Sequence, residues 1–169
     1  EISLAGGFRT TRFDTDAPGV MAIIEQAYGQ ATHALRLPLH GGFAPMASIV
    51  RDIPLIARRS SRGRGTTRTA LGLDEQRPVV LASFGGHGVR MPYAEVARDG
   101  RVLVLLTEWE AEANAGVETI PNARCLTTRE LTEKHIRYEE LVAAADVVVS
   151  KPGYGIVSEC IANSTALLY

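Results

Sequence analysis

The residue types best suited to binding chemistry gather in residues 151–159, directly after an apolar run and at the start of a helical pattern. Lys151 places a cation where a phosphate could lie, and Gly153 and Gly155 leave room for a ligand beside the backbone. Glu159 follows about one helical turn later, where a carboxylate can accept two hydrogen bonds from vicinal hydroxyls such as those of a ribose. A favourable position near a positive helix end would explain Glu159 alone, but it would not explain why a lysine and two glycines occur beside it. The candidate binding residues of this segment are Lys151, Gly153, Tyr154, Gly155, Ser158 and Glu159.

A second candidate is the glycine-rich loop after the apolar run 79–84, which contains Gly85, Gly86, His87 and Gly88. Glycines at the carboxyl end of a strand let backbone N–H groups approach a phosphate, and the positive end of the next helix favours the anion. His87 could donate a hydrogen bond to a pyrophosphate oxygen or to a sugar hydroxyl. A tight turn that binds nothing, with an exposed histidine, explains the same residues equally well. The sequence contains neither the dinucleotide Gly-x-Gly-x-x-Gly pattern nor a Walker motif.

Two further clusters of charged residues can be interpreted either as functional sites or as ordinary surface structure. Glu108, Glu110 and Glu112 surround Trp109 after an apolar run and could act as acid or base, but a solvated loop or helix start is favoured. Residues 58–68 hold five arginines among serines and glycines, and this basic segment could touch phosphate. We interpret it as a solvated linker, because such residues also serve solubility and turn formation.

The elements that position these residues follow from the apolar pattern. Short continuous apolar runs rich in β-branched residues are typical of strands buried on both faces of a parallel sheet. Strands are expected at 34–39, 79–84, 101–107, 123–126, 146–149 and 166–169. Helices are expected at about 20–29, 66–73, 92–98, 138–145 and 156–163. This alternation predicts an α/β fold with a doubly wound parallel sheet, whose carboxyl edge would gather both glycine-containing turns.

Composition excludes several functional classes. The chain is 46% hydrophobic and 22% charged, as in a globular protein with a sizeable core, and its net charge of −1 offers no footprint for nucleic acid. Cys125 and Cys160 have no metal-ligand spacing, so we expect reduced thiols, no metal and a cytoplasmic protein. No apolar run reaches the length of a transmembrane segment.

Residues 143–159 carry a resemblance to a known family. The segment Ala-Ala-Ala-Asp at 143–146 leads into an apolar strand, and Lys151 opens the pattern Lys-x-Gly-x-x-x-x-Ser-Glu. This arrangement resembles the donor-binding domain of GT-B glycosyltransferases, near the group of the bacterial lipid-linked N-acetylglucosaminyltransferase of peptidoglycan synthesis. The turn Lys-x-Gly-Tyr-Gly-x-Val-Ser-Glu is also similar to that of uncharacterised glycosyltransferase-like proteins and of the glycosyltransferase-like part fused to some sugar kinases. The resemblance covers residues 71–169 well and 27–59 loosely.

The resemblance implies a Rossmann-like domain that binds a nucleotide diphosphate sugar, with a UDP-sugar as the first expectation, and transfers the sugar to an acceptor hydroxyl. Glu159 would bind the ribose hydroxyls, and the loop 85–88 with the backbone at 153–155 would hold the diphosphate. No metal or other cofactor is expected, since helix ends and backbone amides neutralise the leaving group in this fold. His40, which precedes two glycines, is the candidate general base, although an ordinary structural turn explains it too.

The predicted domains are a remnant of an acceptor-side domain plus linker, residues 1–65, and a nucleotide-sugar-binding domain, residues 66–169. Both ends look cut, so the fold is expected to be incomplete, with self-association through an exposed sheet edge. The chain would then derive from a hexosyltransferase without being active alone. A non-catalytic nucleotide-sugar-binding or regulatory module, or part of a sugar-kinase fusion, is the alternative. A nucleotide-sugar epimerase is weaker, because it would need more acid and base groups around the sugar.

Overall fold

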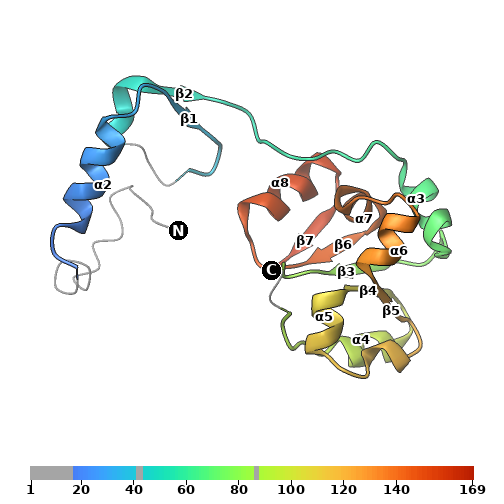
Figure 1. Cartoon of the computed structure of the whole chain (residues 1–169). Helices are drawn as coiled ribbons and strands as arrows, with labels where there is room; N and C mark the ends of the chain where they lie inside the picture. Colours follow the sequence, from blue (N-terminus) through green and yellow to red (C-terminus); the bar gives the residue numbers. More distant parts are fainter. Residues whose placement is uncertain (1–16, 41–43, 86–87) are drawn as a thin grey trace. The chain divides into compact units, whose positions relative to one another are not determined.

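The computed structural model describes residues 17–40, 44–85 and 88–169. The chain divides into two compact units, Glu1–Ile56 and Ala57–Tyr169, each of which is described separately (Figure 1). No helix in the described ranges combines the length and apolar character that crossing a bilayer requires.

The first unit pairs two short parallel strands. Its described elements are helix α2 (Val20–Gly29), strand β1 (Ala34–Arg36), 3-10 helix η1 (Ala44–Ile49) and strand β2 (Val50–Asp52). The guanidinium of Arg36 donates to the carboxylate of Asp52 with Nε and Oδ1 2.5 Å apart, and these two residues are partners in the strand register. The expected helix is confirmed, whereas the expected strand 34–39 ends at Arg36. Sequence analysis missed β2, because three residues are too few to show an alternation.

The second unit is built on a five-stranded parallel sheet, as the sequence predicted. Its strands are β3 (Val79–Ala82), β4 (Leu103–Thr107), β5 (Ala123–Leu126), β6 (Val147–Val149) and β7 (Ala166–Leu168). Their spatial order is β5-β4-β3-β6-β7, and every neighbouring pair is parallel. In this order the chain first moves outward from β3 in one direction and then returns to continue on its other side. This is the doubly wound arrangement of a Rossmann-like domain.

Helices cover both faces of this sheet (Figure 1). They are α3 (Arg64–Leu71), α4 (Tyr93–Asp99), α5 (Glu108–Ala113), η2 (Val117–Thr119), α6 (Thr128–Glu133), α7 (Tyr138–Ala144) and α8 (Tyr154–Ala162). One core joins α3, α7 and α8 to strand residues such as Leu81, Leu105 and Val148, while the other joins α4 and η2 to Ala82 and Leu106. Apolar residues therefore follow one another without alternation along each strand, because both faces are buried.

The basic segment 58–68 is not a solvated linker, and this corrects its interpretation from sequence. Arg68 is buried on α3, where its guanidinium donates to Ala144 O and to Asp146 Oδ2, at 2.9 and 2.7 Å. Arg64 donates to Asp146 Oδ1 at 2.6 Å, and the N–H of Val79 donates to Oδ2 at 2.7 Å. One carboxylate thus ties α3 to the beginnings of β3 and β6, at the edge of the sheet opposite the glycine turns.

Candidate functional site

A cavity of about 370 Å³ lies where β3 and β6 end side by side. These two strands flank the point at which the strand order reverses, and ligands of doubly wound sheets bind in the crevice outside that point. The cavity is lined by Arg58, Ser83, Phe84, Gly85, Tyr138, Ser150, Lys151, Gly153, Gly155, Ile156 and Glu159. Both turns that the sequence singled out therefore meet at one place, although they are more than sixty residues apart in the chain.

The glycine loop leaves β3 through Gly85, which has a φ of +69° that favours glycine over residues with a side chain. Gly88 has a different reason to be glycine. A Cβ at this position would lie 2.0 Å from the carbonyl oxygen of Trp109 and 2.6 Å from the Cβ of Ala113, both on α5. Gly88 is therefore required for packing the loop against a helix. Gly86 and His87 lie outside the described residues, so their predicted roles stay predictions.

The buried carboxylate of Glu110 anchors this loop through hydrogen bonds to its backbone. Glu110, on α5, is fully buried, and its Oε1 and Oε2 atoms accept hydrogen bonds from the N–H groups of Phe84 at 2.7 Å and Val89 at 3.0 Å. Sequence analysis favoured a solvated loop or a helix start for Glu110. The residue does lie in the first turn of α5, but it is buried rather than solvated. The carboxylate instead holds the two sides of the loop at a fixed separation.

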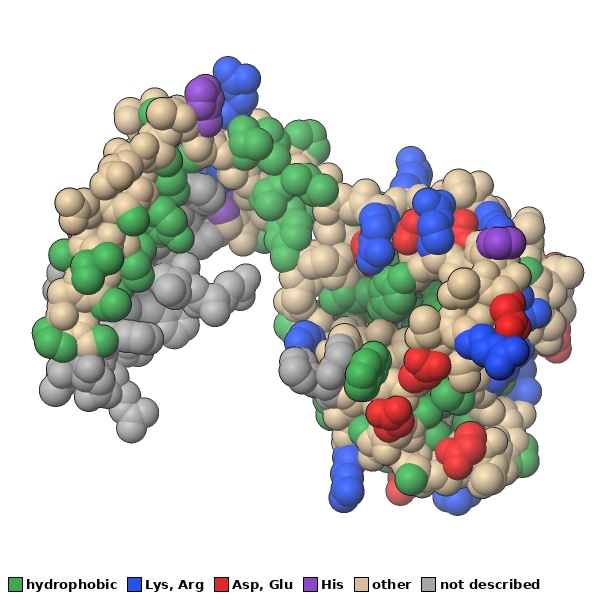
Figure 2. Space-filling model, viewed as in Figure 1, with side chains coloured by type: hydrophobic (Ala, Val, Ile, Leu, Met, Phe, Trp, Pro, Cys, Tyr) green, Lys and Arg blue, Asp and Glu red, His purple; other side chains and the backbone are tan. Residues whose placement is uncertain are grey.

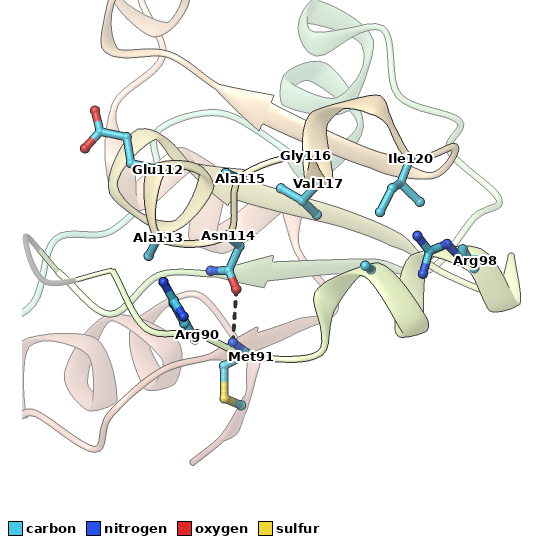
Figure 3. A pocket seen from close by; sticks show the side chains of 11 residues that line it. Arg90, Met91, Arg98, Glu112, Ala113, Asn114, Ala115, Gly116, Val117 and Ile120 are labelled. Atoms are coloured by element: carbon cyan, nitrogen blue, oxygen red, sulfur yellow. Dashed lines mark hydrogen bonds between the residues drawn. The ribbon is translucent and has the colours of Figure 1, made fainter.

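A second cavity, of about 560 Å³, lies between α4 and the segment that follows α5 (Figure 3). Asn114 accepts a hydrogen bond from the N–H of Met91 at 3.1 Å and donates to the carbonyl of Val89 at 2.8 Å, which continues the anchoring begun by Glu110. Arg90 and Arg98 are among the side chains that line this cavity. None of the residues that the sequence singled out for binding lies here.

The second turn presents the open beginning of α8. The N–H of Gly153 donates to the carbonyl of Lys151 at 2.7 Å, a three-residue turn that the ring of Pro152 favours. The first N–H of α8 to find an intrahelical acceptor is that of Val157, so the preceding amides are available to a ligand, as at any helix start. A Cβ at Gly153 or Gly155 would meet nothing within 4 Å. These glycines thus border open space, as expected of residues beside a ligand.

Lys151 and Glu159 supply the charges of this side of the cavity. Lys151 is exposed, and its ammonium has no hydrogen-bond or ion-pair partner among the described residues. Glu159 is 6% exposed, and its Oε1 accepts a hydrogen bond from Nε of Arg58 at 2.5 Å. Burial would lower the pKa of a guanidinium, but the stronger hydrogen bond to Glu159 raises the pKa of Arg58. Sequence analysis missed this partner, because 101 residues separate the two.

Two members of the predicted set, Tyr154 and Ser158, are not among the residues that line the cavity. The hydroxyl of Ser158 donates to the carbonyl of Gly155 at 2.9 Å within α8, and the side chain is buried. The hydroxyl of Tyr154 is buried without a hydrogen-bond partner among the described residues, and Tyr154 does not line the cavity. The predicted binding roles of these two side chains stay predictions, while Gly153 and Gly155 of the same turn line the cavity.

His40, the predicted general base, belongs to the first unit, where it is exposed in the loop that follows β1. The pKa of Asp52, at the end of β2, is lowered mainly by its hydrogen bond to Arg36 and least by the nearby His40. The cavity and all its lining residues belong to the second unit. The catalytic role of His40 remains a prediction.

The surface of the second unit carries charges of both signs. Figure 2 shows basic and acidic side chains on the visible face of this unit, without a single-sign field over it. This distribution agrees with the net charge of −1 of the whole sequence.

Comparison with known proteins gives one similarity and no family. No family model matches this chain. A stretch of 148 residues is 29% identical to part of the L-arabinokinase of Arabidopsis thaliana. The match covers 86% of this chain and 13% of the plant protein. The chain therefore has a distant similarity to a small region of a much longer protein named as a sugar kinase, and this agrees with the sugar-kinase fusions among the resemblances noted from its sequence.

Proposed function

We propose that the second unit binds a nucleotide diphosphate sugar, with a UDP-sugar as the expected donor, in the cavity between β3 and β6. One observation carries this proposal: a buried carboxylate, an available ammonium and an open helix start converge on the switch point of a doubly wound sheet. The size of about 370 Å³ lies within the usual range of small-molecule sites.

The charges suit the two halves of such a ligand. The diphosphate would lie at the open start of α8 beside Lys151, where a helix end contributes about 0.3–1 kcal/mol and charge-assisted hydrogen bonds about 1.5–3 kcal/mol each. The carboxylate of Glu159 would accept both hydroxyls of the ribose, a bidentate arrangement that a deoxyribose cannot offer. The glycine loop anchored by Glu110 would close the opposite side of the diphosphate.

In the glycosyltransferase form of this proposal, an acceptor hydroxyl displaces the nucleoside diphosphate at the anomeric carbon of the sugar. The bond from that carbon to the diphosphate oxygen breaks, a bond to the acceptor oxygen forms, and the acceptor proton passes to a general base. His40 is the candidate base. Developing charge on the leaving diphosphate would be stabilised by the amides of α8 and by Lys151, without a metal.

The second candidate is a nucleotide-sugar-binding or regulatory module without transferase activity. The similarity to a short region of a protein named as a kinase favours it, because such a region could serve as an accessory part of a larger enzyme. Both candidates use the same cavity, so binding tests the site and turnover separates the two functions.

Isothermal titration of the full chain with UDP, UDP-sugars and other nucleoside diphosphates tests the site. We expect UDP to bind, and Glu159→Gln to weaken binding at least tenfold, because two charge-assisted hydrogen bonds become weaker neutral ones. Glu95→Gln is the matched control, since Glu95 is an exposed carboxylate on α4, away from the cavity. Equal affinity of the Glu159→Gln variant and the unaltered chain would refute the ribose assignment.

A further inference from the structure

Arg58 joins two buried carboxylates at the wall of the cavity. Its Nε donates to Oε1 of Glu159 at 2.5 Å, and its Nη1 lies 3.8 Å from Oε2 of Glu139. Its guanidinium carbon also lies 5.7 Å from the centre of the Tyr138 ring, within the range of a cation–π contact. The Arg58 side chain is 60% exposed, whereas those of Glu139 and Glu159 are 4% and 7% exposed. A solvent-exposed cation thus lies beside two buried anions.

One oxygen of the Glu139 carboxylate lacks a hydrogen-bond donor, whereas the other, Oε1, lies 3.2 Å from Nε of Arg137. Oε2 of Glu139 is buried and accepts no hydrogen bond from the described residues, and its nearest cation is the Nη1 of Arg58. A buried carboxylate oxygen without a donor is uncommon, because its lost hydration is not replaced. Oε2 of Glu139 is therefore an unsatisfied acceptor 3.8 Å from a guanidinium that is now bound to Glu159, while Oε1 is paired with Arg137.

The backbone under Arg58 is held in place, so that only its side chain needs to move. Asn163, at the end of α8, donates from Nδ2 to the carbonyl of Arg58 at 3.1 Å. Its Oδ1 accepts from the N–H of Ser60 at 2.8 Å. The segment is thus fixed to the same helix that carries Glu159, and the guanidinium can exchange partners without rearranging the chain.

We propose that Arg58 is a displaceable internal ligand of the site: it occupies Glu159 while the cavity is empty, and moves to Glu139 when the vicinal hydroxyls of a ribonucleotide take its place. This proposal rests on the proposed function. The exchange replaces one donor on Glu159 by two and gives the vacant oxygen of Glu139 its donor. A 2′-deoxyribonucleotide brings one hydroxyl, which only replaces the bond it breaks, so Arg58 stays in place. Arg58 would therefore determine selectivity for ribose.

The Nε–H resonance of Arg58 in the ¹⁵N-labelled full chain tests this exchange, with Arg58→Lys assigning the signal. A hydrogen bond as short as 2.5 Å shifts this proton downfield. We expect saturating UDP to move the signal and 2′-deoxy-UDP to leave it unchanged. UDP that binds, with Glu159→Gln weakening it, while the Arg58 signal stays still would overturn the exchange and leave the proposed function intact. Failure of UDP to bind at all would refute both.

A variant of the second partner tests where the guanidinium goes. Glu139→Gln should weaken UDP binding about fivefold, because the displaced Arg58 loses its charged acceptor. Arg59→Met is the control for a nearby charge change, since Arg59 adjoins Arg58 in sequence but does not line the cavity. Thermal unfolding verifies that both variants are folded. Unchanged UDP affinity in folded Glu139→Gln would overturn the role of Glu139.

Discussion

At the scale of single residues, the two turns require glycine for different physical reasons. A side chain at position 88 would overlap the backbone of α5, whereas Gly153 and Gly155 face open space beside the cavity. The sequence predicted that glycines would gather here, but could not separate packing from ligand access. The burial of Glu110 and the pairing of Arg58 with Glu159 were missed for a related reason. Both are consequences of the tertiary fold, and 101 residues separate Arg58 from its partner.

This difference predicts opposite effects for two alanine substitutions. Gly88→Ala should destabilise the protein by about 1–3 kcal/mol, because its Cβ would overlap a backbone carbonyl that cannot move independently. Gly155→Ala should keep or raise the melting temperature, since alanine is favoured over glycine inside a helix by up to about 1 kcal/mol. The same Gly155→Ala change should weaken UDP binding by narrowing the cavity. Thermal unfolding measures the effects on stability, and UDP titration measures the effect on binding. Equal melting temperatures of the Gly88→Ala and Gly155→Ala variants would contradict the different roles of these two glycines.

At the scale of elements, most of the sheet could be predicted and the short polar helices could not. The strands of the second unit follow from continuous apolar runs, which only burial on both faces explains. Helix α6 was missed, because its first turns are polar and its only partly buried apolar contact with the core comes from Leu131. Helix α3 was placed correctly but its arginines were misread, since their pairing with Asp146 spans about eighty residues.

The Asp146 cluster predicts a defined loss of stability in acid. Burial would raise the pKa of Asp146, but the Val79 N–H and the guanidinium groups of Arg68 and Arg64 outweigh it and hold that pKa below its ordinary value. A carboxyl group with a lowered pKa in the folded state stabilises the protein above its unfolded pKa of about 4, and this contribution disappears as the pH falls through the folded pKa.

Asp146→Asn should therefore lower stability at pH 7 and show a smaller further loss between pH 5 and 2 than the unaltered chain. Asp99→Asn is the matched comparison, because Asp99 pairs with Arg101 at the surface and tethers no other element. Urea unfolding at successive pH values measures both variants. A pH dependence of Asp146→Asn identical to that of the unaltered chain would contradict the role of this cluster.

At the scale of the whole molecule, the sequence predicted a binding domain preceded by a smaller region, and the structure divides the chain at Ile56 and Ala57. The basic segment belongs by its contacts to the second unit, where Arg58 lines the cavity and Arg68 is buried. Composition alone could not reveal this, because arginines in a linker and arginines in a buried cluster look alike in sequence. The identity of the first unit as an acceptor-side remnant remains a prediction.

This division predicts that nucleotide binding needs only the second unit. Every residue that lines the cavity, and the residues that fix Arg58, Glu110 and Asp146, lie within 57–169. A chain of residues 57–169 should therefore unfold cooperatively and bind UDP within about threefold of the full chain, a difference below about 0.7 kcal/mol. Any transfer of sugar should need the full chain, because His40 is absent from the shorter one. If the shorter chain folds but does not bind UDP, part of the site must come from residues 1–56.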